Sequence, residues 1–160
     1  MRTNCSVILM RIALVLVFLI GLVICLYWYP LSITLSTGIA ILDYDPTEIT
    51  SQEYIEFYSQ LLFYWIISLP CFVLVLMGFI CTEYTRKYGK FNAKSANILF
   101  KMALILFMSS FIFLFGNLIF MFLDWNPLPL LYCIVGGAGI LFSAGLYAAH
   151  RYIVKRSADV

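Results

Sequence analysis

Four long apolar runs, separated by shorter polar segments, dominate the pattern of hydrophobic and polar positions along the chain. The runs cover about residues 7–29, 57–82, 98–123 and 130–152. Each is longer than the ~20 apolar residues that a helix needs to cross the hydrocarbon core of a bilayer. The pattern therefore predicts an all-α protein with a single domain, residues 1–160, that spans a membrane four times.

The polar segments between the runs differ in charge and in length. Residues 30–56 form the largest one, an outer loop with five acidic residues and no Lys or Arg. Residues 83–97 form a basic turn, whose cations are Arg86, Lys87, Lys90 and Lys94. The third connection is short and contains two prolines. So short a connection predicts that the last two helices are antiparallel neighbours.

The distribution of charge predicts the orientation of the chain. Only 11% of the residues are charged, against about a quarter in a soluble domain. With residues 83–97 in the cytoplasm, all ten Lys and Arg residues fall on the cytoplasmic side, as the positive-inside rule requires. We therefore expect a four-helix bundle in the plasma membrane, with both termini cytoplasmic.

Aromatic and capping residues predict where the helices meet the membrane surface. Residues 27–29 form an aromatic belt, and Pro30 is expected to end the first helix. The apolar residues 31–42 should lie against the membrane surface or the bundle. Thr50 and Glu53 form a capping box, so the next helix should begin directly after Thr50. The aromatic residues expected to ring the start of that second span are Tyr54, Phe57, Tyr58, Tyr64 and Trp65.

Two residues inside the spans predict irregular or polar packing. Pro70 should kink the second helix and free the carbonyl of Ile66, for which Ser68 is the candidate partner; a functional hinge or cavity wall is the alternative. Asn117 is the most polar uncharged residue well inside a span. It is expected to form a hydrogen bond across a helix pair, with a ligand or ion site as the alternative. Asn92 should cap the third helix.

The fourth span is rich in small residues that repeat at helical spacing. Gly139 and Ser143 share one stripe, and Gly137, Ala144 and Ala148 share another. Small residues allow helix backbones to approach closely in lipid, where burying apolar surface between helices gains little. The fourth helix is therefore expected to be the packing centre of the bundle.

No residue pattern points to catalysis or to a cofactor. The five cysteines form no Cys-x-x-Cys pair and are expected to be packing residues rather than a thiol–disulfide centre. His150 is expected to anchor the last helix at the membrane interface. Asp43, Asp45 and Glu48 could ligate a hard cation but lack the glycine and spacing of an EF-hand loop. We expect no enzyme, cofactor, metal ligand or nucleic-acid partner, and whether the outer loop binds a cation stays open.

The stretch Gly89-Lys90-Phe91-Asn92-Ala93-Lys94-Ser95-Ala96-Asn97-Ile98-Leu99 resembles the turn before the third helix in domain-of-unknown-function family 2975. These are small bacterial four-helix membrane proteins. The chain departs from their Gly-x-Pro-Phe-polar pattern in lacking a proline before Phe91 and in having Asn92 where Ser or Thr is usual. The resemblance implies the same four-helix architecture and brings no established activity.

Two classes of function fit these features. An accessory, regulatory or immunity-type subunit would act by packing its helices against another membrane protein or a second copy of itself. The alternative is an oligomeric transporter or pore-forming subunit. Ion-coupled carriers usually hold a charged group at membrane depth, and no Asp or Glu lies inside a predicted span. The first class is therefore favoured. Membrane lipid is an expected partner in both, and the basic turn could hold anionic headgroups.

Overall fold

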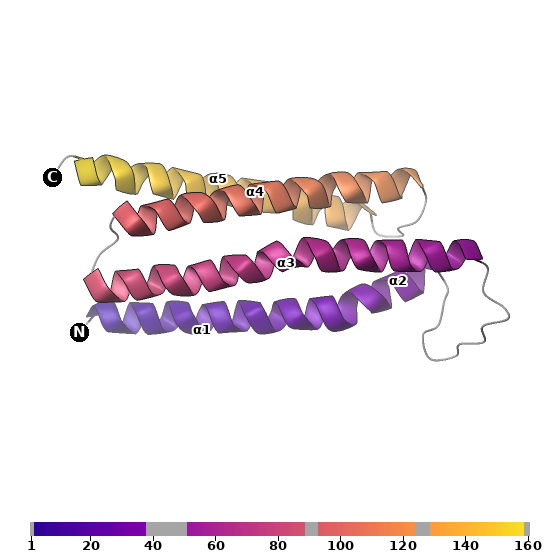
Figure 1. Ribbon diagram of the computed structural model, residues 1–160, viewed down its shortest axis with the longest axis horizontal. Helices are drawn as coiled ribbons and strands as arrows, with labels where there is room; N and C mark the ends of the chain where they lie inside the picture. The colour runs from indigo at the N-terminus through magenta and orange to yellow at the C-terminus, as the bar shows by residue number, and fades with distance from the viewer. Residues whose placement is uncertain (1, 38–50, 89–92, 124–128, 159–160) are drawn as a thin grey trace.

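The computed structural model describes residues 2–37, 51–88, 93–123 and 129–158, and all of its regular structure in these ranges is helical (Figure 1). Four helical stretches are long and apolar enough to cross a membrane. They are Val7–Ile33, Ile55–Tyr88, Lys94–Phe122 and Leu131–Lys155. The all-α class and the number of candidate spans are therefore confirmed, and the chain has the make-up of a multi-pass membrane protein.

The first span is built from three consecutive helical segments and each later span from one. Helix α1 (Arg2–Val23) runs into a π-helical turn, η1 (Ile24–Trp28), and then into α2 (Tyr29–Thr37). The remaining helices are α3 (Ser51–Tyr88), α4 (Ala93–Phe122) and α5 (Pro129–Ala158). Helix α3 begins directly after Thr50, as the capping box predicts. The side chain of Thr50, the cap Asn92 and the outer-loop acids Asp43, Asp45 and Glu48 lie outside the described residues.

The helices form two antiparallel pairs lying side by side. Helices α1 and α3 make one pair, and α4 and α5 make the other (Figure 1). The start of α1, the end of α3, the start of α4 and the end of α5 share one end of the bundle. We call this the basic end, because the Lys and Arg residues of the described chain lie toward it. The start of α1 and the end of α5 are therefore on one side of the bundle, as an even number of crossings requires.

Helix α5 is an edge helix, so the prediction that the fourth span is the packing centre is wrong. Among the described elements, its backbone approaches only that of α4, whereas α3 contacts α1, α2 and α4. A Cβ added to Gly136 would lie 3.2 Å from the Cα of Leu114, so this glycine permits the close α4–α5 contact. The small residues of α5 thus hold it tightly to one neighbour instead of centring it among several.

Pro30 does not end the first helix, contrary to the prediction. It is the second residue of α2, which continues to Thr37. Proline is tolerated in the first turn of a helix, where its missing N–H is not needed, and the π-helical turn before it provides such a new start. The outer connection is correspondingly shorter than predicted, and Ile33 is 1% exposed in the core.

Pro70 lies inside α3, which continues on both sides of it. The prediction that Ser68 bonds to the carbonyl of Ile66 is wrong, because the Ser68 hydroxyl donates to the carbonyl of Tyr64, 2.6 Å away. A serine hydroxyl in a helix reaches the carbonyl three or four residues before it more easily than one two residues before it. Ser68 therefore bonds within its own turn of α3.

Candidate functional site

Six side chains with polar atoms gather inside the bundle, in the half away from the basic end. We call them the buried polar cluster: Tyr29, Ser32, Gln60, Tyr64, Asn117 and Tyr132. Three of them are almost completely buried, with Gln60 and Tyr64 1% exposed and Asn117 0% exposed. They come from α2, α3, α4 and α5, so the cluster is where the two helix pairs meet.

A hydrogen bond between Tyr64 and Asn117 lies at the centre of this cluster. The Tyr64 hydroxyl of α3 donates to Oδ1 of Asn117 in α4 over 2.8 Å. The amide nitrogen of Asn117 donates to the carbonyl of Phe113 over 2.7 Å. Both ends of the asparagine amide are therefore engaged, and α3 is tied to α4 at membrane depth.

Two further tyrosines extend the cluster to the other helices. The ring of Tyr29 stacks on that of Tyr64, with centroids 4.8 Å apart. The Tyr132 hydroxyl of α5 donates to the Ser32 hydroxyl of α2 over 3.2 Å. The prediction that Tyr64 lies at the membrane surface is wrong, because its side chain is in the core. Its hydroxyl bonds to Asn117, which is far away in the sequence, in place of water.

The hydrogen bonds of the buried polar cluster indicate a structural role. Among the described residues, every buried side-chain nitrogen and oxygen atom has a hydrogen-bond partner. Buried polar groups without partners are costly, and in lipid no water replaces the missing bond. No nucleophile with an adjacent base is present in the cluster. Its arrangement is suited to fixing the helices in one register.

A second hydrogen bond between helices satisfies a backbone carbonyl near Pro30. In the π-helical turn the Tyr29 N–H bonds to the carbonyl of Ile24. The next carbonyl, that of Cys25, would take the N–H of residue 30, and proline has none. The indole nitrogen of Trp65 in α3 donates to this carbonyl over 3.1 Å. Trp65, expected only as an interfacial residue, thus satisfies a backbone group in another span.

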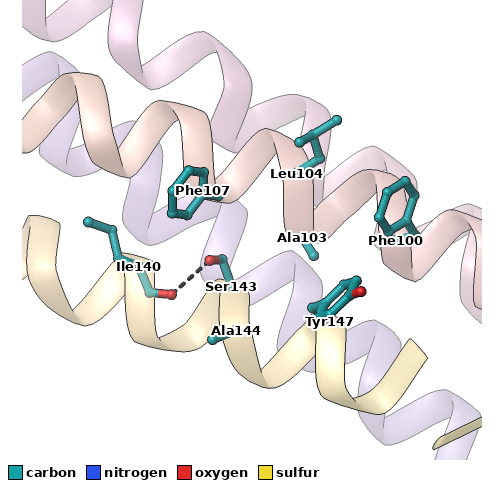
Figure 2. Close-up of a pocket in the computed structure, with 8 residues that line it drawn as sticks. All are labelled: Phe100, Ala103, Leu104, Phe107, Ile140, Ser143, Ala144 and Tyr147. Atoms are coloured by element: carbon teal, nitrogen blue, oxygen red, sulfur yellow. Dashed lines mark hydrogen bonds between the residues drawn. The ribbon is translucent and has the colours of Figure 1, made fainter. Parts of the chain in front are cut away.

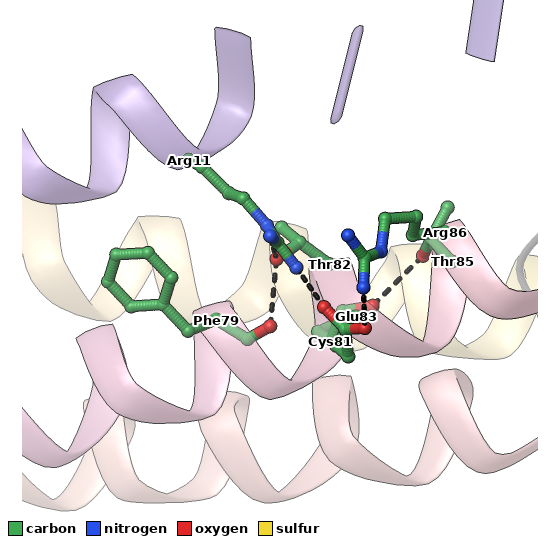
Figure 3. A network of polar contacts seen from close by, with 7 residues as sticks. All are labelled: Arg11, Phe79, Cys81, Thr82, Glu83, Thr85 and Arg86. Atoms are coloured by element: carbon green, nitrogen blue, oxygen red, sulfur yellow. Dashed lines mark hydrogen bonds and ion pairs between the residues drawn. The ribbon is translucent and has the colours of Figure 1, made fainter. Parts of the chain in front are cut away.

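An ionic network joins α1 to α3 near the basic end (Figure 3). The Arg11 guanidinium reaches across to Glu83, with which it forms an ion pair, and to the Thr82 hydroxyl, 3.3 Å away. Arg86 pairs with the other oxygen of Glu83 over 2.5 Å. Arg11 is the one cation inside the first apolar run, and its acidic partner is apparent only when α1 and α3 are side by side.

The other predicted basic residues lie along the same end. Lys87 and Lys94 are exposed, and the Lys87 ammonium lies 5.8 Å from the ring centroid of Tyr88. Lys90 is outside the described residues. His150 donates from Nδ1 to the carbonyl of Ala96 over 2.8 Å, which requires the proton to be on that nitrogen. This bond ties the end of α5 to the start of α4.

The two small-residue stripes of α5 have different surroundings. Ser143 is 4% exposed, and a Cβ on Gly139 would collide with Ser110 of α4, so this stripe faces α4. The other stripe faces outward at Gly137 and Ala148, whereas Ala144 lies at the margin between α5 and α4. A Cβ on Gly137 would meet nothing within 4 Å, and Ala144 and Ala148 are exposed.

Large residues accompany the outward stripe on the side of α5 opposite to α4. We call this surface the outward face of α5: Ile134, Gly137, Leu141, Gly145 and Ala148. Ile134 and Leu141 are 61% and 75% exposed, and a Cβ on Gly145 would meet nothing within 4 Å. Two glycines and an alanine between larger side chains give this face a shallow, uneven surface.

Comparison of the chain with protein-family models, with curated proteins and with solved structures finds no match. The resemblance to domain-of-unknown-function family 2975 therefore stays a prediction.

Proposed function

We propose that the protein is an accessory, regulatory or immunity-type subunit of the plasma membrane, with both termini in the cytoplasm. It acts by packing the outward face of α5 against another integral membrane protein or a second copy of itself. One observation carries this proposal: the side of α5 opposite α4 bears Gly137 and Gly145, at which an added Cβ would meet nothing within 4 Å, and the exposed Ala148.

The small residues that lie between the large ones distinguish this face from the exposed surface of α1. On α1, large side chains such as Leu9 and Val23 are 70% and 62% exposed. Such residues fit a surface that stays in contact with acyl chains. Glycine and alanine instead let a second helix approach, so that close van der Waals contact stabilises the pair. The outward face of α5 is therefore better suited to a helix than to lipid alone.

A matched pair of variants tests the proposal. Gly145→Leu with Ala148→Leu fills the outward face, and Ala13→Leu makes a similar change at an exposed position of α1. After purification in mild detergent and crosslinking, the wild type and the α1 variant should give a complex of fixed stoichiometry. The α5 variant should run as a monomer with the same helical content.

Two outcomes would count against the proposal. One is a wild-type protein that is only monomeric, with no stoichiometric partner, in detergent and in membranes. The other is a saturable, mutation-sensitive ion or solute flux in proteoliposomes, which would favour an oligomeric transporter or pore.

A further inference from the structure

An apolar groove runs between α4 and α5 in the half of the bundle nearer to the basic end (Figure 2). Its volume is about 340 Å³, and its walls include Phe100, Leu104 and Phe107 of α4 and Ile140, Ala144 and Tyr147 of α5. This volume is near the lower limit for small-molecule sites, about 300–1,000 Å³. It is enough for part of one long apolar chain and too small for a whole lipid.

The groove has almost no polar surface to offer a ligand. Its one serine, Ser143, donates its hydroxyl to the carbonyl of Ile140 over 2.7 Å and is thereby satisfied (Figure 2). The Tyr147 hydroxyl lies at the end of the ring that points toward the C-terminal end of α5. The interior of the groove thus suits a hydrocarbon, and polarity begins only at its mouth near the basic end.

Two exposed cations are neighbours of groove residues along the helices. Arg151 follows Tyr147 by four residues, so it lies one turn closer to the basic end on the same face of α5. Lys101 lies three residues before Leu104 on α4. Both side chains are exposed, and neither forms an ion pair with another residue of the described chain. A positive mouth over an apolar groove is complementary to an anionic headgroup attached to an acyl chain.

We propose that this groove holds one acyl chain of an anionic phospholipid, from the leaflet at the basic end, and that Lys101 and Arg151 bind its phosphate. The site is distinct from the outward face of α5 and does not depend on the function proposed above. A cation near the membrane surface favours anionic lipid severalfold, so two cations should give a preference of roughly an order of magnitude over a zwitterionic lipid of the same chains.

Native mass spectrometry of the detergent-purified full chain tests this site. The probes are phosphatidylglycerol and phosphatidylcholine with identical acyl chains, with inorganic phosphate as a competitor. The wild type should retain one phosphatidylglycerol, about tenfold in preference to phosphatidylcholine, and millimolar phosphate should not displace it. Binding at equal levels of the two lipids, or displacement by free phosphate, would overturn the proposal.

Two kinds of variant separate the groove from its mouth. Ala144→Phe fills the groove and should reduce lipid retention about tenfold, whereas Ala149→Phe, exposed on another side of α5, should not. Lys101→Gln with Arg151→Gln should abolish the preference for phosphatidylglycerol, while Lys87→Gln, at the end of α3, leaves it intact. Retention unchanged by Ala144→Phe, or a protein mass bound in place of the lipid, would show that no lipid occupies this groove.

Discussion

Single side chains satisfy backbone and polar groups that the apolar spans would otherwise leave without partners. Trp65 donates to the carbonyl of Cys25, and Tyr64 donates to Asn117. Both bonds join residues far apart in the chain, and both lie in helices with few other polar atoms. Their loss should therefore be felt in the stability of the whole bundle.

Trp65→Phe should lower the free energy of unfolding by about 1 kcal/mol, because the Cys25 carbonyl loses its donor while most of the ring packing remains. Thermal unfolding in mild detergent measures the effect. Trp28→Phe, at a tryptophan that is 45% exposed, is the control and should be close to neutral. An equal effect of the two substitutions would mean that the indole bond contributes nothing.

The bond between Tyr64 and Asn117 can be isolated by a double-mutant cycle with Tyr64→Phe and Asn117→Ala. Interhelical hydrogen bonds in membrane proteins average about 0.6 kcal/mol and reach about 1.7. We expect a coupling free energy toward the upper part of this range, because both side chains are buried. If the double variant loses as much stability as the two single variants together, the hydrogen bond contributes nothing and packing alone stabilises the pair.

At the scale of elements, hydropathy and capping predict where most helices lie. The wrong predictions concern features that depend on contacts between helices. The start of α3 follows from Thr50 and Glu53. The passage of the first helix through Pro30 does not, since it depends on the π-helical turn and on a tryptophan in another span. Likewise, the side of α5 that meets α4 depends on Leu114 and Ser110, whose opposition to Gly136 and Gly139 is not encoded in the spacing of α5 itself.

The ring of Phe63 in α3 packs directly against a glycine of α4. A Cβ at Gly116 would collide with the ring of Phe63. Gly116→Ala should therefore cost about 1–3 kcal/mol of stability through overpacking, measured as a fall in the unfolding midpoint in detergent. Gly145→Ala, where nothing lies within 4 Å, is the matched control and should not destabilise. Phe63→Leu should partly restore the Gly116→Ala variant.

For the molecule as a whole, the start of α1 and the end of α5 lie at the same end of the bundle. The protein therefore has only two possible orientations in the membrane. In a cysteine-free background, Asp45→Cys should react with a membrane-impermeant thiol reagent on intact cells. Lys90→Cys should react only after the membrane is permeabilised, because the positive-inside rule puts the basic turn in the cytoplasm. The reverse labelling pattern would invert the proposed topology.

The sequence predicts only part of the arrangement of the whole molecule. Four spans and an even crossing number follow from the apolar runs. The buried polar cluster does not, because Tyr29, Tyr64 and Tyr132 are indistinguishable in the sequence from tyrosines at the membrane surface. Only the pairing of α2, α3, α4 and α5 brings their hydroxyls and rings together.

Among the described helices the backbone of α5 approaches only that of α4, so the chain can be divided into two helical hairpins. Its two helical hairpins are linked covalently by the basic turn alone and otherwise by contacts through the membrane interior. Residues 1–90 and 91–160, made as separate polypeptides in one cell, should find each other and reassemble, detectable by copurification through a tag on either fragment. Asn117→Ala should weaken this complementation. A gene break at the basic turn would then leave the assembled structure intact.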